Sequence, residues 1–236
     1  MPHRKSPGNN LLLTALTNED RKELMPSLTQ VELRTSAVVA EPYTTLQYAY
    51  FPLQSIVSLV SVMPDGASIA VANVGNEGLI GCGGLLQVES MPYRAVVKVP
   101  GCASRIAIKK LKEIFDERLT LRREVLRYLH SLMTQIAQTA VCGRFHSIEQ
   151  RLARCILSSR DRIHKNSFPY TQEFLAQMLG ADRSSLTLAA GALKRAGFIE
   201  YKRGTMTILD SEGLEQVVCE CYHLLKREFK NRLPMF

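Results

Sequence analysis

The feature that most constrains the fold is a long stretch almost free of helix breakers. Residues 102–168 contain one glycine, Gly143, and no proline. Within this stretch, apolar or small residues recur at alternating intervals of four and three, at Val125, Leu129, Leu132, Ile136, Thr139 and Gly143. This spacing lines them up along one face of a helix and is typical of helices that pair. We therefore expect a long helix that dimerises along this seam.

The same helix has a second apolar face. Its opposite side carries Leu126, Met133, Ala137 and Ala140. One face can pack on a neighbouring domain while the other pairs with a second subunit. A single long core helix in a monomer is the alternative.

Residues 42–101 have the opposite character, since they hold seven of the fourteen glycines and five of the ten prolines. Between these breaks, and just after them, lie short β-branched runs at residues 56–62, 68–74, 94–99 and 103–108. Pro64-Asp65-Gly66 joins the first two runs and predicts a hairpin turn. The pattern predicts a small antiparallel barrel or jelly roll. A helix near residues 18–27, capped by Thr17 or Asn18, is expected before it.

The segment after Pro169 is the most informative for function. Residues 171–179 predict a short amphipathic helix that Gly180 ends, and Asp182 suits the N-cap of a second helix. The inward residues of that second helix are expected to be Leu186, Ala189, Ala190 and Leu193. Gly197 ends it, and residues 198–209 predict a β-hairpin with a basic tip. Helix, turn, helix and hairpin together indicate a winged helix-turn-helix.

The charge of the chain favours a polyanionic partner. The net charge is +8, of which +3 falls in residues 1–143 and +5 in residues 144–236. On the second helix, Arg183, Ser184 and Thr187 point away from the buried residues and are expected to read base edges in a DNA major groove. Contacts with the DNA backbone are expected from Thr171, Gln172, Ser185, Lys202 and Arg203.

The sequence indicates a cytoplasmic protein. The polar N-terminus MPHRKSPGNN is not followed by an apolar signal core. Residues 42–64 carry no charge but contain three prolines, so buried strands fit them better than a membrane-spanning helix. We expect no membrane partner.

The six cysteines are expected to be reduced core thiols, at positions 82, 102, 142, 155, 219 and 221. No four-ligand zinc spacing is visible along the chain. Cys219, Cys221 and His223 lie close in sequence, but on one helix Cys221 would face away from the other two. No metal site is therefore predicted.

The order of these parts resembles the Crp/Fnr superfamily of bacterial transcription regulators, over residues 18–222. The motifs are TQEFLAQMLGADRSSLTLAAGALKRAGFIEYKRGTMTILD at residues 171–210, FPLQSIVSLVSV at residues 51–62 and LIGCGGLL at residues 79–86. The resemblance implies an α+β fold with an antiparallel β-roll of the cyclic-nucleotide-binding type, a dimerisation helix and a winged helix-turn-helix. The expected parts are an N-terminal tail (1–17), the effector-like β-roll (18–116), the dimerisation helix (117–145) and the DNA-binding domain with a C-terminal helical extension (146–236).

The resemblance further implies a homodimer that binds a palindromic DNA operator and works with RNA polymerase. Family members that bind cyclic AMP hold it with a Gly-Glu pair and an Arg-Ser pair. The corresponding stretches here read Gly81-Cys82 and Tyr93-Arg94-Ala95. Cysteine lacks the carboxylate acceptor, and a one-residue shift of Arg94 along a strand reverses its face.

Where the family's long helix meets the adenine, this chain has Ile136 and Ala137, with no hydroxyl. We therefore expect cyclic AMP not to be the effector. A pocket for another ligand, such as an anion held by Arg94, remains an alternative. Its residues would be Gly81, Cys82, Tyr93, Arg94, Ala95, Ile136 and Ala137. The iron–sulfur members carry cysteines near the N-terminus, whereas the first cysteine here is Cys82. No haem ligand stands out either, so no cofactor is expected.

No nucleophile–base pair, phosphate loop or metal constellation indicates an enzyme. Two alternatives remain. The chain could be a cyclic-nucleotide- or other small-ligand-sensing module of an enzyme or channel, or an enzyme with Cys82 as nucleophile if the fold brings His130 or His146 beside it. Residues 212–233 form one amphipathic stripe, expected to pack on its own domain or at a subunit interface: Leu214, Val217, Val218, Cys221, Leu224, Leu225 and Phe229.

Overall fold

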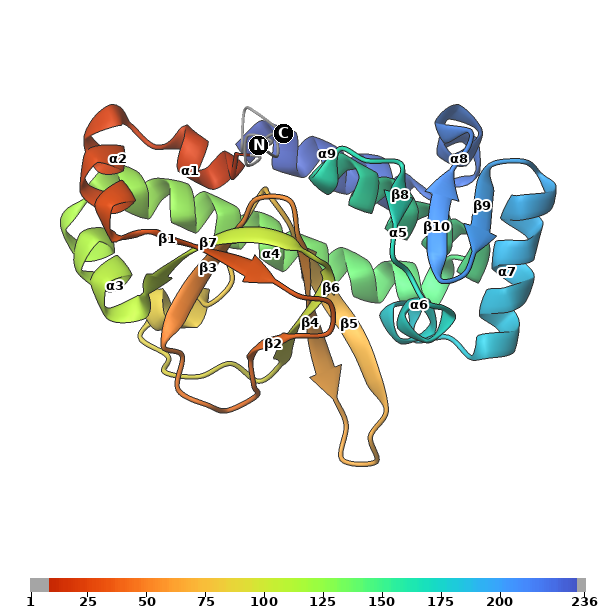
Figure 1. The fold of residues 1–236 in the computed structure, drawn as a ribbon, viewed down its shortest axis with the longest axis horizontal. Helices are drawn as coiled ribbons and strands as arrows, with labels where there is room; N and C mark the ends of the chain where they lie inside the picture. The colour runs from red at the N-terminus through yellow and green to blue at the C-terminus, as the bar shows by residue number, and fades with distance from the viewer. Residues whose placement is uncertain (1–8, 233–236) are drawn as a thin grey trace, which may run out of the picture.

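The computed structural model describes residues 9–232 (Figure 1). A long central helix runs through the molecule, with a β-roll against its N-terminal half and a smaller helical domain beyond its C-terminal end. The predicted α+β class and the order of parts are confirmed. Within the described residues, no helix has the length and apolar character needed to cross a membrane.

The N-terminal helices are part of the fold. Helix α2 (Asn18–Leu24) begins at Thr17, whose side chain accepts a hydrogen bond from the Asp20 N–H, and a 3-10 turn (Met25–Ser27) follows it. This confirms the predicted helix and its cap. The sequence did not indicate α1 (Leu11–Ala15), whose Leu12 is fully buried. The predicted tail of residues 1–17 is therefore wrong for the part that the structure describes, and residues 1–8 lie outside it.

The β-roll consists of two antiparallel sheets, with strand orders β1-β7-β3 and β2-β6-β4-β5. Strands β4, β5 and β6 match the predicted runs to the residue. The hairpin between β4 and β5 turns at Pro64–Gly66, as predicted. The strand bounds are β1 (Thr29–Leu33), β2 (Val38–Ala40), β3 (Tyr48–Pro52), β4 (Ile56–Val62), β5 (Ser68–Val74), β6 (Arg94–Val99) and β7 (Gly101–Ala107).

Helix α4 (Leu119–Phe145) follows α3 (Ile108–Glu117) and covers the β-roll. Its Val125 and Leu132 are buried in the core of the roll, and Leu129 and Ile136 pack against that core. The predicted dimer seam is thus wrong for these four residues, because they face the chain's own β-roll. Thr139 is half-buried and Gly143 exposed. The exposed apolar face is the opposite one, where Leu126 is 49% and Met133 70% exposed.

The C-terminal domain begins with α5 (Ile148–Ile163), which Ser147 and Gln150 cap reciprocally. Strands β8 and β9 flank β10 in a small antiparallel sheet. The remaining bounds are β8 (Ser167–Phe168), α6 (Gln172–Leu179), α7 (Arg183–Arg195), β9 (Ile199–Lys202), β10 (Thr205–Ile208), α8 (Ser211–Val217) and α9 (Glu220–Arg232).

The predicted amphipathic stripe over residues 212–233 is divided between two helices, because the chain leaves helical geometry at Val218, which is extended (φ −71°, ψ 148°). Leu233 lies outside the described residues. Helix α9 runs back along α4, and its Phe229 belongs to the core of the β-roll (Figure 1). Helix α9 therefore connects the C-terminal domain to the β-roll of the same chain.

A buried ion pair joins the β-roll to the C-terminal domain. Arg162 of α5 lies 2.8 Å from the carboxylate of Glu77, and the two side chains are 6% and 1% exposed. The second carboxylate oxygen of Glu77 accepts the Gly75 N–H at 3.0 Å. A Cβ on Gly75 would lie 2.8 Å from the Arg162 side chain, so only glycine allows this close approach.

We predict that Glu77→Gln lowers the free energy of unfolding by about 3–5 kcal/mol, because it leaves a buried guanidinium without its counter-charge. Urea denaturation followed by circular dichroism measures the change. As a control, Glu41→Gln breaks the exposed Arg94–Glu41 pair and should cost at most about 1 kcal/mol. Equal losses in the two variants would contradict a special role for the buried pair.

Candidate nucleic-acid interface

Local capping signals set the geometry of the helix-turn-helix. The Thr171 hydroxyl accepts the Phe174 N–H at 3.1 Å and begins α6. Gly180 ends α6 with a positive φ of 54°, which glycine adopts without strain. Asp182 begins α7, since its carboxylate accepts the Ser185 N–H at 2.8 Å. The sequence predicted the end at Gly180 and the cap at Asp182, whereas Thr171, expected as the first helical residue, is the N-cap of α6.

The buried side of α7 fixes which side faces outward. Leu186, Ala189 and Leu193 are buried in the core of the C-terminal domain, and Ala190 is half-buried, as predicted. In Figure 1, α7 lies at the end of the molecule, beside the β9–β10 hairpin. The opposite side of α7 is therefore open to a partner.

The predicted base-reading residues all lie on this open side. Arg183, Ser184 and Thr187 are exposed in the first two turns. The Thr187 hydroxyl donates to the Arg183 carbonyl at 2.7 Å, and the Ser184 hydroxyl donates to Asp182 at 2.5 Å. The Ser185 hydroxyl is half-buried and donates to the other Asp182 oxygen at 2.7 Å. Ser185 thus supports the cap, and its predicted contact with the DNA backbone would require that bond to break.

Sequence reasoning missed Leu188 on the same side. It is 72% exposed, although leucine is usually buried. Its position four residues after Ser184 and three before Gly191 places all three on one helical face. This spacing of four and three residues could have placed Leu188 on the open side from the sequence alone. An exposed leucine beside Thr187 gives the face an apolar contact of the kind that suits a thymine methyl group.

The electrostatics of the two helix starts differ. Hydrogen bonds from the Ser184 hydroxyl and from Ser185 hold the pKa of Asp182 well below its usual range. Its negative charge therefore persists at the start of α7, where it offsets the partial positive charge of the helix N-terminus. At α6 the cap is the neutral Thr171, with half-buried Gln172 following it. The start of α6 is thus the better place for a phosphate, although Glu173 lies in its first turn.

The hairpin tip carries the predicted basic residues. Lys202 and Arg203 are both exposed, and Lys202 lies 2.6 Å from the Glu200 carboxylate. This pair lowers the pKa of Glu200. The tip therefore presents Arg203 as its main positive group and a Lys202 whose charge is partly balanced.

Comparisons with known proteins agree with this geometry. Residues 150–217 match the Crp-like helix-turn-helix domain. No curated protein matches the sequence. A transcriptional regulator of the Crp/Fnr family from Eubacterium rectale is similar in structure, with a TM-score of 0.67 at 15% identity over 87% of this chain and 96% of that one.

Two further solved structures share the fold. FixK2 from Bradyrhizobium japonicum has a TM-score of 0.70 at 12% identity, over 81% of this chain and 98% of its own. The c-di-GMP responsive regulator CLP from Xanthomonas campestris has a TM-score of 0.64 at 13% identity, over 81% and 99%. Residues 150–217 therefore carry a Crp-like helix-turn-helix domain, and the chain shares the fold of these solved structures. The predicted fold is thereby confirmed.

The β-roll of this chain does not gather the predicted effector-pocket residues at one place. On β6, Ala95 is fully buried while Arg94 lies on the other face and pairs with Glu41 at 2.8 Å. Arg94 and Ala95 thus lie on opposite faces of β6, as expected for neighbouring residues of a strand. On α4, Ile136 packs against the core while Ala137 is exposed. Arg94 and Ala137 thus lie outside the interior that Ala95 and Ile136 face.

That interior is packed mainly with aliphatic side chains, together with a few aromatic ones. Tyr128 of α4 is buried and donates its hydroxyl to the Leu79 carbonyl at 3.1 Å. Cys82 follows Gly81, and burial raises the pKa of its thiol to about 11. Burial also raises the pKa of half-buried Tyr93 to about 12. Such a thiol is protonated at neutral pH and suits a packing role rather than nucleophilic attack.

The histidines considered as bases for Cys82 are engaged elsewhere. His130 lies 3.0 Å from Glu228 of α9, and His146 lies 3.5 Å from the thiol of Cys221. The prediction that the cysteines are core thiols holds for Cys82 and Cys155, which are buried in the main cores. It is wrong for Cys102, which is exposed. Cys142, Cys219 and Cys221 form a separate cluster.

Proposed function

We propose that the protein is a sequence-specific DNA-binding transcription regulator that acts as a homodimer on a palindromic operator. The open N-terminal face of α7 supports this function most directly. A major groove admits one helix, and residues near the helix N-terminus then reach base edges. The buried Leu186 and Leu193 hold α7 so that this face meets DNA.

The residues of the interface divide into two groups. Arg183 suits a guanine through two parallel hydrogen bonds, and Thr187 and Leu188 suit a thymine methyl group. Lys202 and Arg203 of the hairpin, with the start of α6 at Thr171 and Gln172, suit phosphates and fix the register. Specificity thus comes from α7 and sequence-independent affinity from its surroundings.

The exposed face of α4 supports the homodimer. Leu119, Leu126, Met133 and Ala140 recur at intervals of seven along it, with Ala137, Val141 and Phe145 beside them. Leu119 and Phe145 are 73% and 74% exposed. A heptad row of this kind pairs with a second copy of itself about a two-fold axis. The two-fold axis then presents two copies of α7, which matches a palindromic operator.

The effector is proposed not to be cyclic AMP. Arg94 is paired with Glu41 outside the interior, and Cys82 stands where an acceptor carboxylate is needed. The neighbour CLP is itself described as c-di-GMP responsive, so the fold alone does not dictate the effector. RNA polymerase is the partner expected at the operator from the family's role. No observation favours a sensing module of an enzyme or channel, because α7 and its hairpin would then have no use.

We expect Arg183→Ala to weaken operator binding by about 1–3 kcal/mol per half-site and to relax the preference at one base pair, because a bidentate contact with a base is lost. The operator is first selected from random duplexes with the purified protein. Binding of the operator and of a scrambled duplex is then measured across a salt series. Arg34→Ala removes the same charge from an exposed position on the β-roll and should change neither affinity.

Variants of the β9–β10 hairpin are expected to affect affinity but not specificity, in contrast to Arg183→Ala. Lys202→Gln with Arg203→Gln should weaken both duplexes alike and lower the salt slope by about one unit per lost phosphate contact. If Arg183→Ala weakened both duplexes equally while the hairpin variant lost discrimination, α7 would not be the reading helix. Binding of no duplex by the unmodified protein would reject the proposed function.

The dimer is expected to depend on the exposed face of α4. Leu126→Glu with Met133→Glu places four acidic groups in the paired interface and should give a folded monomer in sedimentation velocity, because burying unpaired charges is costly. Leu86→Glu with Met63→Glu makes the same chemical change at positions 52% and 58% exposed in the β-roll and should leave the dimer intact. A dimer that survives the α4 substitutions would place the interface elsewhere.

Titration calorimetry with cyclic AMP is expected to show no binding heat at physiological nucleotide concentrations, because Cys82 replaces the carboxylate anchor and the Arg94 guanidinium is paired with Glu41 outside the interior. Binding of the operator by the same preparation shows that the protein is active. A micromolar dissociation constant for cyclic AMP would contradict this assignment of Cys82 and Arg94.

A further inference from the structure

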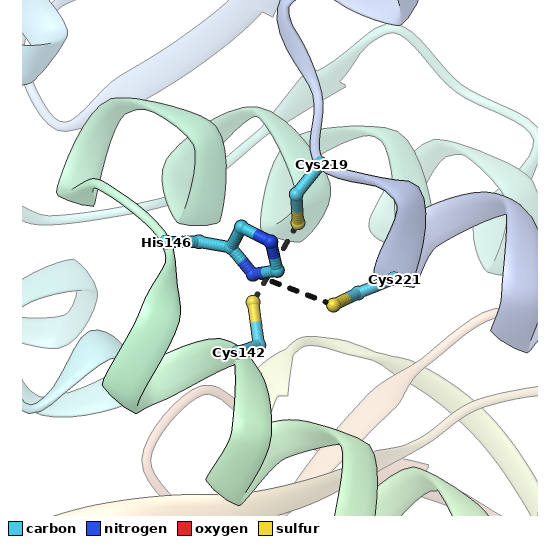
Figure 2. A group of neighbouring side chains, drawn as sticks. All are labelled: Cys142, His146, Cys219 and Cys221. Carbon is cyan, nitrogen blue, oxygen red and sulfur yellow. Dashed lines mark hydrogen bonds between the residues drawn. The ribbon is translucent and has the colours of Figure 1, made fainter.

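Four side chains distant in sequence meet where α4 ends and α9 begins. Cys142, His146, Cys219 and Cys221 point toward one another, and their ligand atoms all lie within 4.8 Å of each other (Figure 2). The sulfurs of Cys142 and Cys219 are 3.6 Å apart. The Cys221 sulfur lies 3.5 Å from Nδ1 of His146. The three cysteines are buried, and the imidazole is 12% exposed.

The broken C-terminal helix makes this meeting possible. Cys142 lies on the last turn of α4, and His146 is the extended residue that ends this helix, with its N–H donating to the Cys142 carbonyl at 3.2 Å. Cys219 lies just before α9 and Cys221 in its first turn, after the extended residue Val218. The prediction that Cys221 faces away from Cys219 assumed one continuous helix and is wrong. The histidine considered with these cysteines was also the wrong one, since His223 is exposed and His146 completes the group.

The cluster is neither a disulfide nor ordinary apolar packing. A disulfide has an S–S distance of about 2.05 Å, much shorter than the 3.6 Å between Cys142 and Cys219. The three cysteines also stand apart from both main hydrophobic cores. Three thiols and an imidazole nitrogen converging on one point are the donor set of a metal site.

We propose that these four residues bind one zinc ion in a closed, tetrahedral Cys3His site. With Zn–S near 2.3 Å and Zn–N near 2.0 Å, the ligand atoms of such a site lie about 3.5–3.8 Å apart. The Cys142–Cys219 and Cys221–His146 separations of 3.6 Å and 3.5 Å match this geometry, and all four ligand atoms lie within 4.8 Å, so a small contraction would complete it. Thiolate and imidazole ligands in tetrahedral arrangement suit zinc. A cluster of several irons spreads its ligands over separate irons, for which this compact group leaves no room.

Neighbouring groups already orient the ligands. The Glu220 carboxylate lies 3.1 Å from Nε2 of His146, which directs the lone pair of Nδ1 toward the sulfurs. The side-chain amide of Gln138 donates to the Cys221 sulfur at 3.0 Å. The hydrogen bond with Cys219 and the positive charge of Arg154 lower the pKa of Cys142, while the same hydrogen bond and burial raise the pKa of Cys219. Arg154 also offsets the net negative charge that three thiolates leave on a zinc dication.

The ion would tie two parts of the chain together. Two ligands belong to α4 and two to the start of α9, 77 residues later for the Cys142–Cys219 pair. The site lies one residue before Ser147, which caps α5 of the DNA-binding domain. Zinc would therefore fix α9 on α4 at the point where α4 gives way to that domain. This role does not rest on DNA binding.

Metal analysis of the full-length protein, purified under reducing conditions without chelator, should find one zinc per chain. Cys142→Ser and Cys219→Ser should each abolish it. Cys102→Ser, the same change at an exposed cysteine of β7, should retain it. Zinc that persists in the first two variants, or iron with acid-labile sulfide in place of zinc, would overturn the proposal.

A second measurement does not depend on the cysteine variants folding. Cobalt added to the metal-free native protein should give the strong visible and near-ultraviolet bands of tetrahedral thiolate coordination, and zinc should abolish them. Glu220→Gln should weaken zinc binding 10- to 100-fold in competition with a chelator, whereas Glu212→Gln on α8, also exposed, should not. Absence of the cobalt bands in the folded native protein, or equal zinc affinity in the two glutamate variants, would also overturn it.

Discussion

The buried pair of Glu77 and Arg162 is the contact on which the placement of the two halves depends. Removing two charges from water is costly, and only good geometry with further hydrogen bonds offsets the cost. Glu77 meets this condition through the Gly75 N–H, and Arg162 through the Ser158 carbonyl at 3.0 Å. Any rotation of α5 against the β-roll must break this pair within a low-dielectric interior. The C-terminal domain is therefore held to the roll by a contact that cannot weaken gradually.

The loop that carries Glu77 also accepts hydrogen bonds from the N-terminal segment and from α4. The Asn10 amide donates to the carbonyls of Pro52 and Gly78, at 3.0 and 2.8 Å. Tyr128 of α4 donates to Leu79. Next to this joint, Gln177 of α6 donates to Ser68 at 2.6 Å and accepts from Lys98 at 3.2 Å. A displacement inside the roll would thus be transmitted to α6 directly, through these hydrogen bonds between the two domains.

Sequence reasoning succeeded where the signal is local. Thr171, Gly180 and Asp182 specify where helices begin and end through bonds to neighbouring residues, so the helix-turn-helix was predictable almost to the residue. The face of α4 that is exposed was not predictable, because Val125 and Leu132 repeat with the same interval as Leu126 and Met133. Periodicity shows that a helix has two apolar stripes but not which one its own β-roll covers. The Cys3His group was hidden for a related reason, since no glycine or proline marks the break at Val218.

The last turn of α4 combines these constraints. Cys142 and His146 face α9, whereas Val141 and Phe145 are exposed on the other side of the same turn. One helical turn therefore carries both the proposed metal ligands and the end of the proposed dimer interface. Only His146 and Ser147 separate this turn from α5 of the C-terminal domain, and Ser147 caps α5 directly. In the proposed dimer, a change in how α9 is held on α4 would therefore act on the spacing of the two copies of α7 through a short connection.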